Sequence, residues 1–143
     1  MEILDLLISD KALLLATAAG LGMFLGIERA INHKAASIRT FSLICTGSCL
    51  FTLLSQEVGI LGDPDPTRIA ANIVTGVGFL GGGVIFKAAD KVEGITTGSM
   101  IWFAAAIGMC CGFNEVSMAI FSCILYTVIL GVGKLMHRLI DGK

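Results

Sequence analysis

The sequence predicts an all-α membrane protein, a polytopic bundle of five transmembrane helices. Hydrophobic residues make up 55% of the 143 residues and charged residues only 15%, whereas a soluble domain has about 25% charged residues. A chain of this size has too much surface to bury so many apolar side chains in water. The charged residues leave long uncharged runs between them, and the 18 glycines on this apolar background are typical of closely packed membrane helices.

The composition also bounds the classes of function. A mean hydropathy of +0.88 excludes a soluble globular domain and a disordered chain. The net charge is −1, so no basic field indicates a nucleic-acid partner. The loops are too short for a soluble domain, and we expect residues 1–143 to form a single transmembrane domain. No nucleophile–base pair and no metal-ligand spacing is visible, so we expect no enzymatic activity, no cofactor and no metal site.

The uncharged runs set the predicted elements in order. A hydrocarbon core of about 30 Å needs about 20 apolar residues in a helix, and four of the runs have this length. The first run is slightly short, so four spans with an interfacial first segment are the alternative. The predicted spans cover approximately residues 8–28, 39–56, 66–87, 94–113 and 116–136.

The third predicted span has a defined start. Asp65 is followed by Pro66, and Asp accepts hydrogen bonds from the free N–H groups of a first helical turn. Proline suits the first helical position, because that N–H needs no partner within the helix. We therefore expect the helix to begin at these two residues.

Lysine and arginine predict the orientation in the membrane. Five spans place the two termini on opposite sides, and the basic residues are split 8 against 2 between those sides. The positive-inside rule then puts the C-terminus in the cytoplasm and the N-terminus outside. Lys11 and Arg68 lie on the outer side, and the inner side has Arg29, Lys34, Arg39, Lys87, Lys91, Lys134, Arg138 and Lys143.

Two stretches of the chain resemble each other. Residues 20–26 are similar to residues 76–81 with one insertion, and residues 34–42 are similar to residues 91–99. The first two spans would then repeat as the third and fourth, in the same direction, about an axis along the membrane normal. Chance similarity between glycine-rich helices is the alternative.

Small residues at four-residue spacing predict helix packing, because close backbone approach drives helix association in lipid. One such stripe lies in the first span and another in the fourth, and each packs inside the bundle or between protomers. The glycines of the third span have a dinucleotide-like GxGxxG spacing but lack the preceding strand which that motif requires. We therefore expect that they either pack against a neighbouring helix or loosen the helix locally at residues 81–83. The residues concerned are Ala18, Gly22, Gly26, Gly76, Gly78, Gly81, Gly83, Ala104, Gly108 and Gly112.

Polar residues inside the spans are candidates for function, because each is costly in lipid. Arg68, Asn72 and Thr75 lie at i, i+4 and i+7 and so share one helix face, with Asp65 just above. Two interpretations stay open for this face. It either forms hydrogen bonds between helices that fix the bundle, or it lines a polar pocket open to the outside.

A second group of polar residues lies at the inner surface. Glu28 and Arg29 end the first span, and Arg39 and Thr40 begin the second. Each is explained by a simple interfacial anchor. The alternative is a charge pair of Glu28 with Arg29 or Arg39 beneath the bundle, for which a partner or an ion competes.

These motifs, in this order, resemble the membrane domain of the MgtC/SapB family. Ser37, Asn72 and Gly98 stand where the family more often has Gly, Gln and Ala. The soluble C-terminal domain of many members has no counterpart in these residues. The matching segments are Gly22–Arg29, which ends in Glu-Arg, then Arg39-Thr40, Asp65–Ala70, Gly76–Gly83, and Gly94–Thr97 with Trp102 downstream.

The resemblance implies a multi-pass protein of the bacterial inner membrane and adds Thr96 and Thr97 to the candidate functional residues. It also implies a link to adaptation to low magnesium and to survival inside host cells. Members are thought to act on other membrane proteins, including the F-type ATP synthase, rather than to transport magnesium. A homo-oligomer is left open.

Three functions follow as hypotheses. The first is a non-enzymatic regulator that binds a membrane partner through exposed helix faces, with Ala104, Gly108 and Gly112 as accessible contacts. The second is a small oligomeric ion transporter or channel subunit that uses the polar face of the third span. The third is a structural scaffold in which every polar residue serves the fold.

Overall fold

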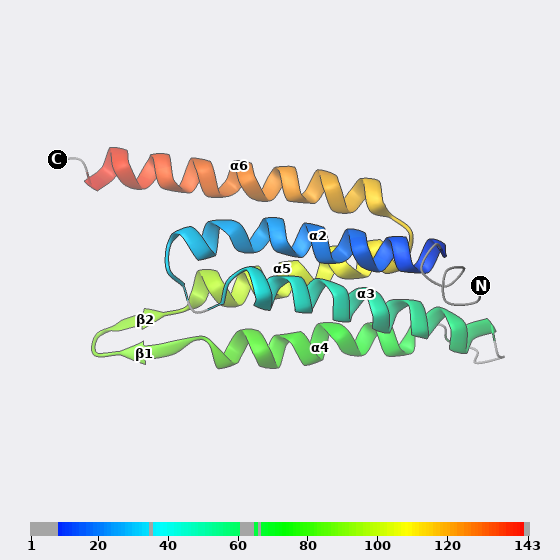
Figure 1. Cartoon of the computed structure of the whole chain (residues 1–143). Coiled ribbons are helices and arrows are strands. Elements are labelled where there is room, and N and C mark those ends of the chain that lie inside the picture. The colour runs from blue at the N-terminus through cyan, green and yellow to red at the C-terminus, as the bar shows by residue number, and fades with distance from the viewer. Residues whose placement is uncertain (1–8, 35, 61–64, 66, 142–143) are drawn as a thin grey trace.

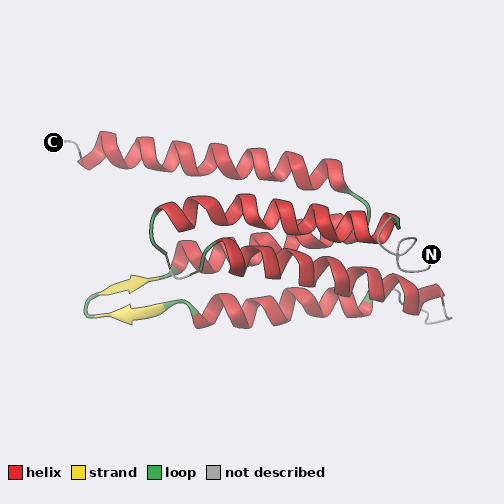
Figure 2. Ribbon diagram, viewed as in Figure 1, coloured by secondary structure: helices red, strands yellow, loops and turns green. Residues whose placement is uncertain are grey.

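The computed structural model describes residues 9–34, 36–60, 65 and 67–141. Within these residues, five helices run alternately in opposite directions along the long axis of the bundle (Figure 1). Figure 2 shows that helices make up almost all of the described chain, with one short pair of strands. The predicted all-α class is confirmed. The helices are α2 (Asp10–Ile31), α3 (Ile38–Ile60), α4 (Arg68–Gly83), α5 (Ile95–Gly112) and α6 (Val116–Asp141), and the strands are β1 (Phe86–Ala88) and β2 (Lys91–Glu93).

Among the described residues, four helices are long and apolar enough to cross a membrane, namely α2, α3, α5 and α6. The chain is therefore a multi-pass membrane protein. Helix α4 has 16 residues, which reach about 24 Å at 1.5 Å per residue, less than the hydrocarbon core of about 30 Å. The ends of the other predicted spans lie within a few residues of these helices, apart from residue 8, which lies outside the described residues.

The predicted third span over residues 66–87 is wrong in extent. Pro66 lies outside the described residues, and α4 begins at Arg68 and ends at Gly83. Three consecutive glycines, 81–83, close the helix, because glycine is among the weakest helix formers. The chain then forms the β1–β2 hairpin, in which Lys87 lies opposite Val92, and this hairpin extends beyond the helices around it (Figure 1).

Gly94 closes the base of this hairpin and precedes α5. Its φ of 87° is in the left-handed region, which costs glycine nothing and other residues free energy. A Cβ at this position would also lie 2.8 Å from the carbonyl carbon of Val84. Both constraints favour glycine, and they explain the glycine of the Gly-Ile-Thr-Thr segment.

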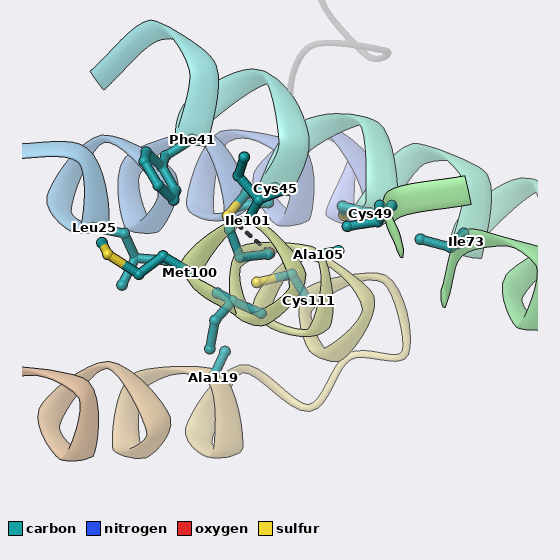
Figure 3. Packing of buried hydrophobic residues seen from close by; sticks show 14 of the residues in the cluster. Leu25, Phe41, Cys45, Cys49, Ile73, Met100, Ile101, Ala105, Cys111 and Ala119 are labelled. Atoms are coloured by element: carbon teal, nitrogen blue, oxygen red, sulfur yellow. Dashed lines mark hydrogen bonds between the residues drawn. The ribbon is translucent and has the colours of Figure 1, made fainter. Parts of the chain in front are cut away.

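Helix α5 lies at the centre of the bundle. It packs against α2, α3, α4 and α6, and half of its span is buried within the chain. Figure 3 shows Met100, Ile101 and Ala105 of α5 facing Leu25 of α2 and Cys45 of α3. The Cys45 thiol donates a hydrogen bond to the Ala104 carbonyl at 3.1 Å. A helix that meets several neighbours and faces lipid on its remaining side needs an apolar surface all round, and α5 has one beyond its first turns, with Trp102 on the exposed side.

Glycine allows α3 and α5 to approach closely. A Cβ at Gly108 would lie 2.9 Å from the Cα of Cys45, and one at Gly112 would lie 2.5 Å from the Cβ of Thr52. Real Cβ atoms essentially never lie within 3.0 Å of such atoms. The two backbones are therefore as close as their side chains permit.

Two further glycine contacts join neighbouring helices. A Cβ at Gly22 of α2 would lie 2.6 Å from the carbonyl oxygen of Phe41 in α3, and a Cβ at Gly81 of α4 would lie 3.1 Å from that of Gly98 in α5. In the suggested repeat Gly26, not Gly22, matches Gly81, so the two contacts differ by about one helical turn. The internal repeat stays a prediction.

The end of α3 satisfies backbone groups of its neighbours. The buried Ser55 hydroxyl accepts a hydrogen bond from the Ala70 N–H at 3.2 Å, in the first turn of α4. The Gln56 amide donates to the Gly112 carbonyl at 3.1 Å, in the last turn of α5. Helix ends have unpaired N–H and C=O groups that lipid cannot satisfy. These two side chains therefore hold three helix ends together.

Replacing Gly108 with leucine is expected to lower the thermal unfolding midpoint of the detergent-solubilised protein. The side chain has no space against α3, and overpacking of this kind costs about 1–3 kcal/mol or more. Gly20→Leu is the matched control, because a Cβ at Gly20 meets no atom within 4 Å, and its midpoint should not change. Equal midpoints for the two variants would contradict the α3–α5 packing.

Candidate functional site

A charge cluster joins α2 and α6 at the end of the bundle where α2 stops. The Glu28 carboxylate accepts from Arg29 Nε at 2.6 Å and from Lys134 Nζ of α6 at 2.9 Å. The Asn32 amide adds a third hydrogen bond at 2.6 Å. Arg29 is only 8% exposed, so its charge depends on this carboxylate. The predicted charge pair of Glu28 is with Arg29 and not with Arg39.

Tyr126 is the second attachment of α6. Its hydroxyl donates to the Leu25 carbonyl at 3.1 Å, and its ring stacks on Phe103 with the centroids 5.9 Å apart. Tyr126 is not among the residues predicted from the sequence. Its position could have indicated a role, because the only tyrosine in the chain lies inside a predicted span, where its hydroxyl requires a hydrogen-bond partner.

Arg39 and Thr40 lie in the first turn of α3, on another side of the same end of the bundle. Arg39 is exposed and Thr40 is half-buried. Together with Ser37 they border a cavity of about 500 Å³ that reaches Leu80 of α4 and Ile101 of α5. The two inner motifs, Glu-Arg and Arg-Thr, therefore belong to separate sites.

The predicted polar face of α4 is exposed, and Asn72 lies where this face borders the cavity between α3 and α4. Arg68, Asn72 and Thr75 are all exposed, whereas Ala70 and Ile73 are buried. The Asn72 amide donates to the Arg68 carbonyl of its own helix at 3.0 Å. This Asn72 hydrogen bond lies within α4 and does not join two helices.

Asp65 forms a turn just before α4. Its carboxylate accepts from the Thr67 hydroxyl at 2.7 Å and from the Thr67 N–H at 2.9 Å. These hydrogen bonds, with a smaller contribution from Arg68, hold the pKa of Asp65 below its ordinary value. The carboxylate precedes the helix by three residues instead of capping it directly. Thr67 occupies the N-cap position, but its side chain makes no capping hydrogen bond to the helix.

The candidate glycines fall into two groups. One group meets a neighbouring helix and comprises Gly22, Gly26, Gly81, Gly108 and Gly112. The other group faces open space within this chain, so a packing role there requires another molecule and stays a prediction. It comprises Gly76, Gly78 and Gly83.

The expectation that Ala104, Gly108 and Gly112 are accessible to a partner is wrong. All three are buried in the bundle, because α3 packs closely against the surface that these small residues leave.

The candidate threonines Thr96 and Thr97 lie in the first turn of α5, where Thr96 is exposed and Thr97 is half-buried.

Comparison with known proteins assigns the chain to a protein family. A model of the MgtC family matches residues 15–139. The chain belongs to the MgtC family. Protein MgtC of Brucella abortus (strain 2308) is 38% identical over 134 residues, which are 94% of this chain and 54% of that protein.

Two further relatives match most of this chain and about half of their own length. Protein MgtC of Salmonella typhimurium (strain 14028s) is 39% identical over 112 residues, which are 78% of this chain and 47% of the relative. An uncharacterised protein of Synechocystis is 40% identical over 84% of this chain and 50% of its own length. The chain thus spans about half the length of the curated relatives it matches. No solved structure matches it significantly.

In this MgtC-family chain, Glu28→Gln is expected to lower the free energy of unfolding by about 3 kcal/mol, because it leaves the buried Arg29 without an anion. Lys134→Gln is expected to cost at most about 1 kcal/mol, because the lysine side chain is 57% exposed. Unfolding in mixed micelles by titration with a denaturing detergent measures both. Equal losses would show that the Arg29 pair is not the stronger half of the cluster.

Proposed function

We propose that this chain is a non-enzymatic regulator that binds another membrane protein through the outward face of α4. This proposal gives the MgtC family's implied role in magnesium limitation and survival inside host cells a physical basis. Binding between membrane helices needs no reacting groups. It needs a face on which two backbones approach closely.

One observation supports this face above the others. Ala71, Thr75, Gly78 and Gly82 recur at intervals of four, three and four residues along α4, and all are exposed. A Cβ at Gly78 or at Gly82 would meet no atom within 4 Å. The comparable stripe on α5 is already filled by α3, so the stripe on α4 is the one that a partner can use.

Phe79 marks the same face. Its side chain is 83% exposed, next to Gly78, and it projects from a surface of small residues. A large apolar side chain beside small residues suits a partner helix, which takes the aromatic ring into its own groove and approaches closely at the glycines. Thr75 is exposed and Asn72 borders an almost wholly apolar groove, which gives no support to a pore within a single chain, so we do not propose transport.

The proposal includes a location and a first partner to test. The family resemblance favours the bacterial inner membrane, and the basic residues favour an N-terminus outside and a C-terminus in the cytoplasm. The family resemblance suggests the F-type ATP synthase as partner, and its membrane subunits offer helices for α4 to bind.

A photo-cross-linker at Phe79 is expected to capture the partner in native membranes. Gly78→Leu should reduce that capture about tenfold, a loss of about 1.4 kcal/mol, because the added side chain holds the two backbones apart. The variant should insert and unfold like the wild type, since α4 has open space there.

Gly133→Leu serves as the matched control, because Gly133 of α6 is equally open, and it should leave the capture unchanged. Mass spectrometry of the cross-linked product identifies the partner and tests the ATP synthase subunits directly. Undiminished capture by a normally inserted Gly78→Leu protein would refute this interface.

A further inference from the structure

A continuous groove runs between α3 and α4 on a different side of α4 from the partner face. One cavity of about 510 Å³ lies between the middle parts of the two helices. A second, of about 500 Å³, lies at the end where α3 begins. The two cavities share Leu43, Ile44 and Leu80 in their linings. They therefore adjoin and form one groove that is open to the side.

Two glycines give the groove its depth. Gly47 of α3 and Gly76 of α4 line it, and a Cβ at either position would meet no atom within 4 Å. The remaining lining of the middle part is almost wholly apolar, with Ser48 and Asn72 as its polar residues. An apolar chain fits this part of the groove without leaving a polar group unpaired.

The groove has the length of one bilayer leaflet. From Arg39 to Phe51 the α3 wall covers 13 residues, and the rise between the first and the last is about 18 Å at 1.5 Å per residue. One leaflet contributes about half of a hydrocarbon core of about 30 Å. A helix about 10 Å across and 18 Å long occupies roughly 1,400 Å³, which is more than the cavities of about 510 Å³ and 500 Å³ hold together, so a partner helix is too large for the groove.

The mouth of the groove is polar and basic. Arg29 and Lys134 both pair with Glu28, but no carboxylate in the described part of the chain pairs with the exposed Arg39. The hydroxyl groups of Ser37 and Thr40 line the same cavity. An anion therefore has complementary charge and donors at this end.

We propose that the groove binds one anionic phospholipid. The acyl chain lies along Gly47 and Gly76, and the phosphate contacts Arg39 and Thr40. The negative headgroup matches a cation that has no counter-ion within the described residues, whereas a zwitterionic lipid brings its own positive charge to the same place. This site is separate from the partner face and does not rest on the proposed function.

Native mass spectrometry tests the site on the full chain released from vesicles of equal parts phosphatidylglycerol and phosphatidylethanolamine. We expect one retained lipid, with phosphatidylglycerol preferred. Arg39→Gln should reduce the preference about fivefold, the effect of losing one basic side chain at a membrane surface. Arg138→Gln on α6 is the matched charge control and should keep the preference.

A second pair of variants tests the groove itself. Gly47→Leu fills it and should abolish the retained lipid, with the thermal midpoint unchanged because the position is open. Gly133→Leu is its matched control. Retention unaffected by Gly47→Leu, or a preference unaffected by Arg39→Gln, overturns the proposal. Displacement of the lipid by inorganic phosphate alone also overturns it, because the acyl chain is then not part of the binding.

Discussion

The close approach of α3 and α5 is the contact on which the rest of the bundle depends. Lipid tails are as apolar as leucine, so no hydrophobic force drives one membrane helix against another, and contact area at short range must hold them together. Gly108 and Gly112 provide this contact by removing the atoms that would separate the backbones. Once α5 is fixed against α3, it supplies the surface on which α2, α4 and α6 pack. The end of α3 then places Ser55 and Gln56 where the ends of α4 and α5 need them.

Glycine allows close helix contact in one place and leaves open space in another. On α5 glycine faces a neighbour, and on the outer side of α4 it faces open space. In the α3–α4 groove it creates depth beside side chains that would otherwise close the surface. Sequence spacing does not distinguish the first two cases, because Gly108 and Gly112 on α5 and Gly78 and Gly82 on α4 each lie four residues apart. What distinguishes them is whether another helix lies opposite the glycine. The fold as a whole decides this, and the sequence of the helix itself does not.

The fold class and the approximate places of α2, α3, α5 and α6 followed from the sequence, because charge and hydropathy determine which segments enter lipid. The end of α4 did not follow, since hydropathy continues through Val84 and Ile85 although the glycines end the helix. The hairpin escaped prediction because its three-residue strands are too short for a period of two to be seen. At the inner surface, the Glu28–Arg29 pair was among the alternatives, whereas the roles of Tyr126 and Ser55 required their distant partners, Leu25 and Ala70, to be placed first.

The shortness of α4 has a consequence for the membrane around it. Its two longer neighbours span the hydrocarbon, while α4 reaches about 24 Å, so one side of the protein is thinner than the bilayer beside it. A hydrophobic mismatch of this kind is relieved by local thinning of the bilayer, and the cost grows with each ångström. A membrane of shorter-chain lipids relieves it at lower cost. Bilayer thickness thus becomes a variable to which this side of the molecule, and any complex formed there, responds.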